Sequence, residues 1–418
     1  MTINIYEIIV ALFLFLIYSW TAYNTPIIII GLKNRLKRKK KLNSLNLSSP
    51  KFSIIVPAKN EEKVISRVIE ALLNLNYPKD KKEIIIVEDG SEDKTKEICM
   101  EYEKKYLNQI KLISKNNSNG KPSALNEGLK HAKGDIIAFF DADNVPESDV
   151  LLKVANIFSN NSIVAIQGRT CSINPDQNML TKIVSIEESV WFESFLEGRK
   201  ALNLFIPFTG SCQFIKRDIL NELGGFNEDS IVEDIELSLR LLKKGYKVHY
   251  MPEVISLQES PSKISSLKKQ RLRWYRGYME LFLKNISFLK SFEKSKIDAE
   301  MLLSGPYMLS ISFFSYIIGA IIFLFKIPLN NILLFLLNIA LSLLLLILFI
   351  LGISLILFIK PRKIKNIKWL PFIYAYWILQ SFFATFSLIK LILRRKEGWN
   401  KTDRSGAITN KSILENEY

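Results

Sequence analysis

The sequence predicts an α/β domain built on a mostly parallel sheet, flanked along the chain by transmembrane and interfacial helices. Apolar stretches gather near the two ends of the 418 residues, and short β-rich runs alternate with amphipathic helical patterns between them. Continuous apolar strands separated by helices are typical of a parallel sheet buried on both faces. Acidic residues follow several of these strands, and parallel sheets bind their ligands at the carboxyl ends of the strands.

The first apolar stretch, residues 8–32, contains no charged side chain. It is long enough to cross the hydrocarbon, which takes about 20 residues. No basic residue precedes it and no small-residue cleavage site is apparent, so we expect a retained helix and not a signal peptide. The basic run at 33–41 predicts that the following segment is cytoplasmic. We therefore assign residues 1–33 to an N-terminal transmembrane helix with its flank.

Residues 50–280 are predicted to form the cytoplasmic domain. Its pattern predicts strands at 52–57, 83–89, 110–114 and 135–143, and helices over 61–75, from 93, from 123, from 146 and over 235–242. Neither a GxGxxG fingerprint nor a GxxxxGK[ST] loop occurs, so a dinucleotide fold and a Walker loop have no support.

Three further apolar segments, 306–325, 332–359 and 369–393, follow within the region 281–395. As three crossings they would leave the tail, 396–418, outside the cell, whereas the basic residues near 394 predict a cytoplasmic tail. One segment is therefore expected to be re-entrant, interfacial or a hairpin. The segment 369–393 is the candidate, because it contains a proline and a glutamine.

The net charge of +16 first suggests nucleic acid, but the position of the charge argues against it. Three basic runs, 33–41, 360–368 and 390–401, hold 17 of the 57 lysines and arginines, and each adjoins an apolar stretch. Basic residues beside a span mark the cytoplasmic face and meet anionic lipid. We therefore expect a membrane and no nucleic acid. Three distant cysteines exclude a zinc ribbon, and two histidines are too few for a histidine-built metal site.

Two pairs of acids follow predicted strands. Asp141 and Asp143 could share one hard cation such as Mg²⁺, although a solvated turn explains a lone D-x-D equally simply. Glu88 and Asp89 precede a glycine turn in which Ser91 could cap the next helix. That capping explains the serine but not the two acids at the strand end. A carboxylate there could accept a hydrogen bond from an N–H of a nucleobase.

Two other groups have a plain structural alternative. Glu233 and Asp234 open a helical pattern, where acids are electrostatically favoured in any protein. Gln270, Arg273 and Trp274 lie in a basic stretch before the membrane segments, which suits an amphipathic helix at a lipid surface. The functional interpretation gives Arg273 a diphosphate to bind and makes Trp274 a platform for a sugar ring.

The ordered set of these motifs is far more specific than any one of them. They are PAKNE at 57–61, EDGS at 88–91, GKPSALN at 120–126, DAD at 141–143, ED at 233–234 and QRLRW at 270–274. In this order they resemble membrane-embedded family 2 glycosyltransferases, the group of cellulose, chitin and hyaluronan synthases, and most of all poly-N-acetylglucosamine synthases. A patch with Trp399, Arg404 and Gly406 resembles their C-terminal end as well.

The resemblance implies a nucleotide-sugar-binding, GT-A-like domain and a role for each matched residue. Pro57, Ala58, Glu61, Glu88 and Asp89 would hold the nucleoside, Lys121 would approach the nucleotide, and Asp141 and Asp143 would hold Mg²⁺ or Mn²⁺, chiefly through Asp143. Asp234, with Glu233 before it, would be the catalytic base. Gln270, Arg273 and Trp274 would close over donor and acceptor, and Arg404 would reach the diphosphate. The family usually has Asp-Asp where this chain has Glu88-Asp89, which puts the fit of Glu88 in question.

The expected function is inverting transfer of a sugar from a nucleotide-diphosphate donor, UDP-GlcNAc or UDP-glucose, to a growing β-linked polysaccharide that the membrane helices could export. A non-processive enzyme with a membrane-lipid acceptor is the alternative. A transporter with a regulatory domain is disfavoured because the apolar segments hold almost no ionisable residues. A catalytically dead scaffold is disfavoured because every expected acidic position is filled. A multi-pass plasma-membrane location and a small accessory membrane subunit belong to the same expectation.

Overall fold

The computed structural model describes residues 5–38, 49–358, 363–394 and 401–409, which divide into two compact units. We call residues 1–37, 189–202 and 268–397 the helical unit, and residues 38–188, 203–267 and 398–418 the sheet unit. Each unit is described by itself.

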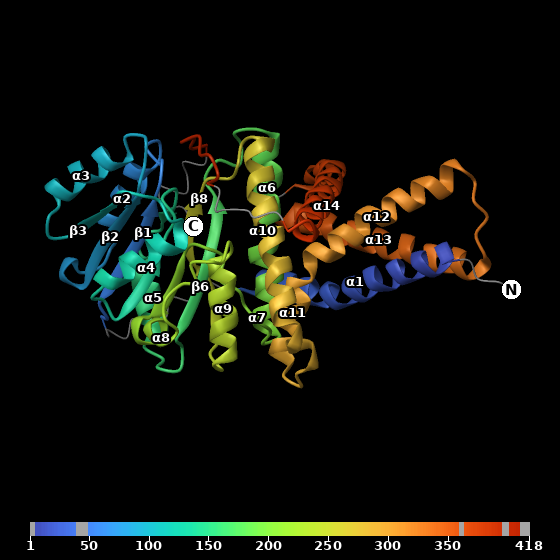
Figure 1. Ribbon diagram of the computed structural model, residues 1–418, viewed down its shortest axis with the longest axis horizontal. Helices are drawn as coiled ribbons and strands as arrows, with labels where there is room; N and C mark the ends of the chain where they lie inside the picture. The colour runs from blue at the N-terminus through green and yellow to red at the C-terminus, as the bar shows by residue number, and fades with distance from the viewer. Residues whose placement is uncertain (1–4, 39–48, 359–362, 395–400, 410–418) are drawn as a thin grey trace. The chain divides into compact units, whose positions relative to one another are not determined.

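The sheet unit contains one eight-stranded mixed sheet in the order β3-β2-β1-β4-β7-β6-β8-β5 (Figure 1). The strands are β1 (Phe52–Ala58), β2 (Lys82–Asp89), β3 (Ile110–Lys115), β4 (Ile136–Phe139), β5 (Val145–Pro146), β6 (Ala165–Ser172), β7 (Gln213–Lys216) and β8 (Val248–Gln258). The first four pair in parallel, whereas β7 pairs antiparallel with both β4 and β6. Since β8 is parallel to β6, it runs in the same direction as β1 to β4.

Helices connect these strands, as the alternating pattern predicts. They are α2 (Ile65–Leu73), η1 (Lys79–Lys81), α3 (Thr95–Lys105), α4 (Lys121–His131), α5 (Val150–Phe158), α6 (Met179–Val190), α8 (Arg217–Glu222) and α9 (Glu233–Lys243). The predicted α/β class and the mostly parallel first half of the sheet are confirmed.

Three predicted boundaries are wrong. The fourth strand ends at Phe139, so the DAD motif lies in the turn after it. The helix expected over 61–75 begins only at Ile65, after a turn. The helix expected from Pro146 begins at Val150, because Val145 and Pro146 pair with β8 as a short edge strand. An edge position tolerates a proline, since a missing N–H there breaks no ladder.

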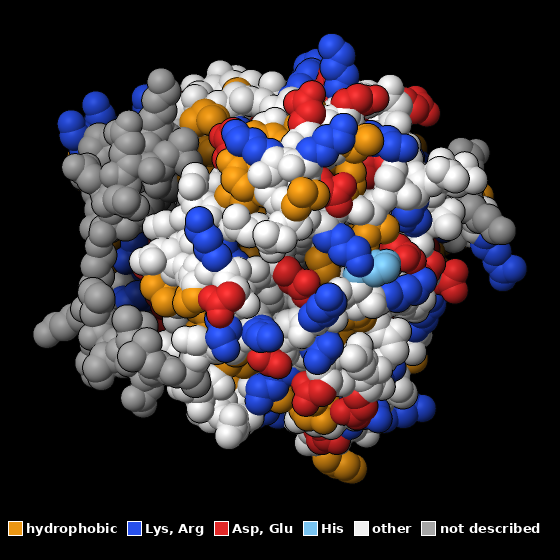
Figure 2. All heavy atoms as spheres, turned by 90° about the vertical axis from the view of Figure 1, so that its left-hand side faces the viewer, with side chains coloured by type: hydrophobic (Ala, Val, Ile, Leu, Met, Phe, Trp, Pro, Cys, Tyr) orange, Lys and Arg blue, Asp and Glu red, His pale blue; other side chains and the backbone are white. Residues whose placement is uncertain are grey.

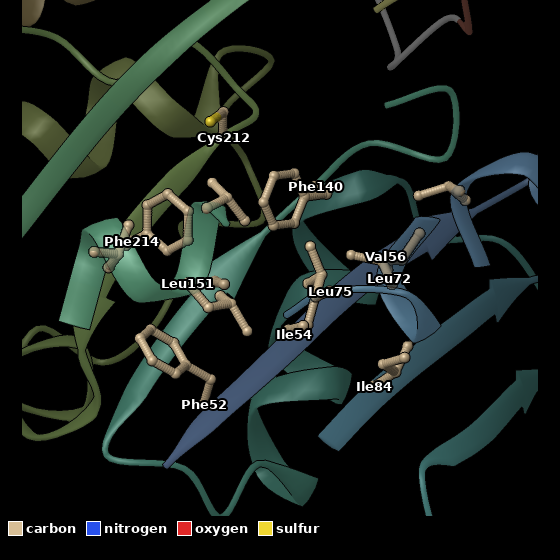
Figure 3. Packing of buried hydrophobic residues seen from close by; sticks show 14 of the residues in the cluster. Phe52, Ile54, Val56, Leu72, Leu75, Ile84, Phe140, Leu151, Cys212 and Phe214 are labelled. Carbon is tan, nitrogen blue, oxygen red and sulfur yellow. The ribbon is translucent and has the colours of Figure 1, made fainter. Parts of the chain in front are cut away.

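The core of the sheet unit packs α2 and α5 against one face of the sheet. Figure 3 shows the β1 side chains Phe52, Ile54 and Val56 close to Leu72 and Leu151. All five are at most 1% exposed. Burying an apolar side chain of this size contributes about 1.5–3 kcal/mol to stability. Several such side chains therefore hold the sheet and these two helices firmly together.

The helical unit contains the apolar segments. Its elements are α1 (Ile5–Lys37), the π-helical turn η2 (Trp191–Leu196), α7 (Glu197–Ala201), most of α10 (Ile264–Asn285), η3 (Ile286–Lys290), α11 (Lys294–Leu303), α12 (Gly305–Leu324), α13 (Asn331–Phe358), η4 (Ile364–Trp369) and α14 (Leu370–Ile392). Four helices of the described chain are long and apolar enough to cross a membrane: 5–37, 305–324, 331–357 and 364–392.

These four helices do not share one direction. Figure 1 shows α1, α12 and α13 lengthwise and α14 almost end-on. Tyr6, near the start of α1, donates a hydrogen bond to the carbonyl of Pro328 between α12 and α13, at 3.1 Å. The start of α1 and the α12–α13 connection therefore lie at the same end of this bundle.

Candidate active site

Acidic residues gather at the carboxyl edge of the sheet because β1, β2, β3, β4, β6 and β8 run in the same direction and end there. Glu88 and Asp89 close β2, and Asp141 and Asp143 follow β4. Glu259 follows β8 directly. This edge is where a parallel sheet binds its ligands, so the structure brings the predicted acids to the expected place.

The loop after β1, which begins at Pro57 and Ala58, is joined to the loop after β2. Asn60, with a positive φ of 54°, donates its N–H to the Ser91 hydroxyl at 3.0 Å and accepts from the Glu92 N–H at 2.7 Å. Ser91 therefore ties the two loops together. The sequence suggested that Ser91 caps the next helix, but α3 begins only at Thr95 and Ser91 does not cap it. The N–H of Thr95, at the start of α3, donates instead to the Asp93 carboxylate at 3.0 Å.

Glu88 is buried and has two partners inside the sheet unit. Its carboxylate accepts from the Ser114 hydroxyl at 2.8 Å and from the N–H of Ser91. The extra methylene that distinguishes Glu88 from aspartate thus carries the carboxylate to two donors. A contact of Glu88 with a nucleoside stays a prediction.

Asp89 holds the loop that precedes α4. It pairs with Lys115 at 2.7 Å and accepts from the Ser118 hydroxyl at 2.6 Å and the Gly120 N–H at 3.2 Å. Gly120 has a φ of 89°, which favours glycine, and precedes Lys121 at the start of α4. The position of Asp89 therefore sets the position of Lys121.

Lys121 connects the two acidic groups of the site. Its ammonium lies 2.7 Å from Asp141 and 3.2 Å from Glu233, and donates to the carbonyl of Gly210 at 3.1 Å. Burial alone would lower the pKa of Lys121, but Asp141 and Glu233 outweigh it and raise that pKa. The lysine is therefore a fixed positive charge between the D-x-D turn and the start of α9.

Glu233 and Asp234 occupy the first turn of α9 but differ in their surroundings. Glu233 is 3% exposed and is paired with Lys121. Asp234 is only partly buried, and a Cβ placed on Gly210 would lie 3.4 Å from its Oδ2. Gly210 therefore leaves the space beside the Asp234 carboxylate. Of this pair, Asp234 is the candidate base, and Glu233 orients Lys121.

Asp141 and Asp143 offer the only predicted metal ligands. Asp143 is buried and accepts from the Glu259 N–H at 2.9 Å, whereas the side chain of Asp141 is 30% exposed. Within the described ranges, no group of three or more His, Cys, Asp and Glu side chains could hold a metal. Two carboxylates of one turn suit Mg²⁺ or Mn²⁺, which take further ligands from diphosphate oxygens and water, and do not suit a protein-enclosed ion.

The C-terminal tail contributes two cations to this edge. Arg404 Nε lies 3.3 Å from Asp143, and Lys401 Nζ lies 3.2 Å from Glu61. Burial raises the pKa of Glu61 to about 7, although Lys401 and Arg404 act in the opposite direction. Arg404 therefore lies beside Asp143, and its predicted contact with a diphosphate stays a prediction. Trp399 falls outside the described residues.

The QRLRW residues lie on α10 and belong to the helical unit. Gln270 is buried, and the guanidinium of Arg271 stacks 4.5 Å from the Trp274 ring centroid. Arg271 thus covers one face of the Trp274 ring, which the sequence predicts as a platform for a sugar ring. The roles of Gln270, Arg273 and Trp274 at the site stay predictions.

Sequence reasoning missed Glu259, which touches both Asp143 and the tail. The rule that acids at parallel strand ends are functional would have found it, because β8 ends one residue earlier. β8 was not among the predicted strands, since its alternation is interrupted by Pro252 and Glu253.

The residues from 50 to 277, more than half of the chain, match the family model described as glycosyltransferase like family 2. The chain belongs to glycosyltransferase family 2, and this prediction is confirmed. It is 36% identical over 249 residues to a beta-monoglucosyldiacylglycerol synthase of Trichormus variabilis, covering 57% of this chain and 52% of that protein. It is 29% identical over 252 residues to a poly-beta-1,6-N-acetyl-D-glucosamine synthase of Staphylococcus epidermidis, covering 60% of each chain.

The fold extends beyond the matched region. A mannosyltransferase of Pyrobaculum calidifontis, solved with GDP-mannose and Mn²⁺, superposes with a TM-score of 0.62 at 20% identity, covering 93% of this chain and 99% of that one. This confirms the predicted GT-A-like fold with its apolar helices. The chain matches little more than half the length of the curated relatives.

One face of the sheet unit carries side chains of both charges. In Figure 2, which views the molecule from the β3 and α3 side, basic and acidic side chains are interspersed. The expectation of no nucleic-acid partner stays a prediction.

Proposed function

We propose that this protein transfers a sugar, with inversion at the anomeric carbon, from a nucleotide-diphosphate donor to an acceptor hydroxyl at the membrane. The observation that carries the proposal is the Lys121 bridge, which links the D-x-D acid Asp141 to the first turn of α9, where Asp234 stands. The bridge sets a donor-binding group and a candidate base at one edge of one sheet.

In this mechanism Asp234 accepts the proton of the acceptor hydroxyl as it attacks. A positioned general base typically contributes about 10²–10⁴-fold. Attack by the acceptor on the face opposite the leaving diphosphate exchanges one bond for another in a single step, so a donor with an α-linkage gives a β-linked product. The nucleoside diphosphate leaves with the bonding electron pair.

The leaving group gains negative charge, and Arg404 would stabilise that charge with charge-assisted hydrogen bonds. Asp143 and Asp141 would hold Mg²⁺ or Mn²⁺, which supplies charge neutralisation on the diphosphate when bound. The mannosyltransferase with the same fold was solved with Mn²⁺, which supports this choice of ions. Lys121 pairs with Asp141 and with Glu233, the neighbour of Asp234 in the sequence.

For the acceptor, we retain the growing β-linked polysaccharide, which the poly-N-acetylglucosamine synthase relative supports. The lipid acceptor is the second candidate, and two observations favour it. The glucosyldiacylglycerol synthase relative is the more identical of the two. The candidate spans are also strongly apolar, which suits contact with lipid better than a polar channel.

The test is a turnover assay of the detergent-solubilised full chain with Mg²⁺ or Mn²⁺. UDP-GlcNAc, UDP-glucose and GDP-mannose are offered separately, with and without diacylglycerol and an extract of host lipids. A ladder of long products indicates a polysaccharide synthase, and a single lipid-soluble product indicates the lipid enzyme. Asp234→Asn should lose at least about 10²-fold in kcat.

The matched control is Asp218→Asn, an exposed aspartate at the start of α8 that should keep full activity. Asp234→Asn with undiminished turnover would exclude this base. An α-linked product would exclude inversion. No consumption of any donor by the wild type would contradict the proposed transfer.

A further inference from the structure

The tail segment, residues 401–409, packs along the carboxyl edge of the sheet unit. Besides its contacts with Glu61 and Asp143, it is anchored at its far end by Thr409. The Thr409 N–H donates to the Ile173 carbonyl, and its hydroxyl accepts from the Asp176 N–H, both at 3.2 Å. The segment therefore crosses the edge as a strap held at both ends.

Glu259, directly after β8, binds the middle of this strap, and its side chain is 1% exposed. One carboxylate oxygen accepts from both the N–H and the hydroxyl of Ser405. The other accepts from the Gly406 N–H at 3.0 Å. Two successive backbone N–H groups that converge on one anion form a nest, which the φ of 78° at Gly406 makes possible.

The backbone of Glu259 holds the other partners in place. Its N–H donates to Asp143 Oδ2 at 2.9 Å, and its carbonyl accepts from Nη1 of Arg404. Arg404 Nε faces the same Asp143 oxygen at 3.3 Å. A single residue thus fixes the acid, the guanidinium and the strap that carries the guanidinium.

A purely structural role for Glu259 would need another partner for its buried charge. Arg67 lies 3.7 Å away, at the limit of an ion pair, and its Nη2 also donates to the Asp143 carbonyl. The shorter hydrogen bonds to Glu259 all come from the strap. A buried carboxylate without hydrogen bonds is costly, so docking of the strap and burial of Glu259 depend on each other.

We propose that Glu259 is a positioning residue that latches the tail segment, so that Arg404 stands ready for the donor diphosphate. This rests on the proposed function, since it gives Arg404 that diphosphate as its ligand. Glu259 touches no reacting atom and acts through Arg404. The latch itself is a property of the protein without any donor.

The first experiment measures the latch without sugar transfer. The full chain carries Lys411→Gln and a C-terminal epitope tag, and the tagged fragments that trypsin releases by cleavage after Lys401 or Arg404 are identified by their mass. We expect slow release from the wild type, at least about 10-fold faster release from Glu259→Ala, and an intermediate rate from Glu259→Gln, which keeps one acceptor oxygen. Glu253→Ala is the matched control, because Glu253 lies on the same strand and is exposed.

The second experiment measures the coupling to Arg404. Glu259→Ala should raise the donor KM by about 10- to 100-fold, the loss expected when a charge-assisted hydrogen bond is removed. In an Arg404→Ala background the same change should have no further effect, because its action runs through Arg404. A thermal melt of each variant checks that the fold is retained.

Equal tag release from wild type and Glu259→Ala would overturn the latch. Multiplicative effects of the two substitutions on KM would overturn the action through Arg404. If the wild type transfers no sugar from any donor, the proposed function fails, yet the trypsin experiment still decides the latch.

Discussion

At the scale of single residues, Lys121 decides whether the acids of the site can stand close together. We expect Lys121→Met to abolish activity and to destabilise the sheet unit by about 3–5 kcal/mol, because it leaves Asp141 and buried Glu233 without their cation. Hydrogen exchange of the backbone amides of β1, β2 and β4 across a urea series measures the loss. Lys130→Met on the same helix is the control, since Lys130 is exposed and pairs only locally with Glu127. Equal stability of the two variants would contradict the bridging role.

Glu61 gives the site a pH dependence of known sign. Burial raises its pKa to about 7 in the folded protein, well above the ordinary value of 4.5. The folded state therefore binds more protons than the unfolded state between these values, so this group lowers stability as the pH rises from 4.5 to 7. Glu61→Gln removes this pH-dependent loss of stability. The melting temperature of the variant minus that of the wild type should rise across this range and level off above it, and a constant difference would refute the assignment.

The site residues that could be predicted from the sequence depend on local patterns, and those that could not depend on long-range pairing. Asp141, Asp143, Glu88 and Asp89 follow local strand patterns, and each is found at the predicted edge. The partners of those acids, by contrast, come from far along the chain, as with Glu259 beside Asp143 and Lys121 beside Glu233. Long-range pairing depends on the strand order, which alternation within one strand does not contain.

At the scale of elements, the strength of the local sequence pattern decides which strands and helices could be predicted. β1 and β2 have continuous apolar centres, and they and β3 are predicted almost to the residue. By contrast, β7 has four residues and is too short to show a period. The apolar stretches of the helical unit were predicted from composition alone, because a span must be long and uncharged.

Two glycines set how closely α1 approaches the helix that continues from α6 through η2 to α7. A Cβ on Gly31 would overlap the Ser194 carbonyl oxygen, and one on Gly198 would overlap that of Ile27. Because backbone cannot yield as a flexible side chain can, Gly198→Ala should destabilise the helical unit by about 1–3 kcal/mol. Gly319→Ala on α12 meets nothing within 4 Å and is the control. Equal melting temperatures for both variants in detergent would contradict the close crossing.

At the scale of the whole molecule, the tail segment 401–409 belongs to the same compact unit as residues 49–188 and 203–267, so we expect these parts on the same side of a membrane. An even number of crossings must then separate these parts, although three apolar helices intervene. Within the helical unit α14 differs in direction from α12 and α13 (Figure 1). In the most apolar 18-residue stretch of 364–392, 44% of the residues are also buried, against 6% and 22% in the corresponding stretches of α12 and α13. We therefore infer that α14 lies in the membrane interface and that α1, α12 and α13 cross.

This topology predicts that the two ends of the chain lie on opposite sides. The Tyr6–Pro328 hydrogen bond places the α12–α13 connection at the same end as the start of α1, so both are expected outside, in agreement with the basic runs on the cytoplasmic side. Epitope tags at the N-terminus, at 327–329 and at the C-terminus are exposed to protease in right-side-out and inside-out vesicles. We expect the first two to be cleaved only in right-side-out vesicles and the third only in inside-out vesicles. If the first and third are cleaved in the same vesicles, the crossings number four, and a tail outside the cell could not reach a cytoplasmic Glu259.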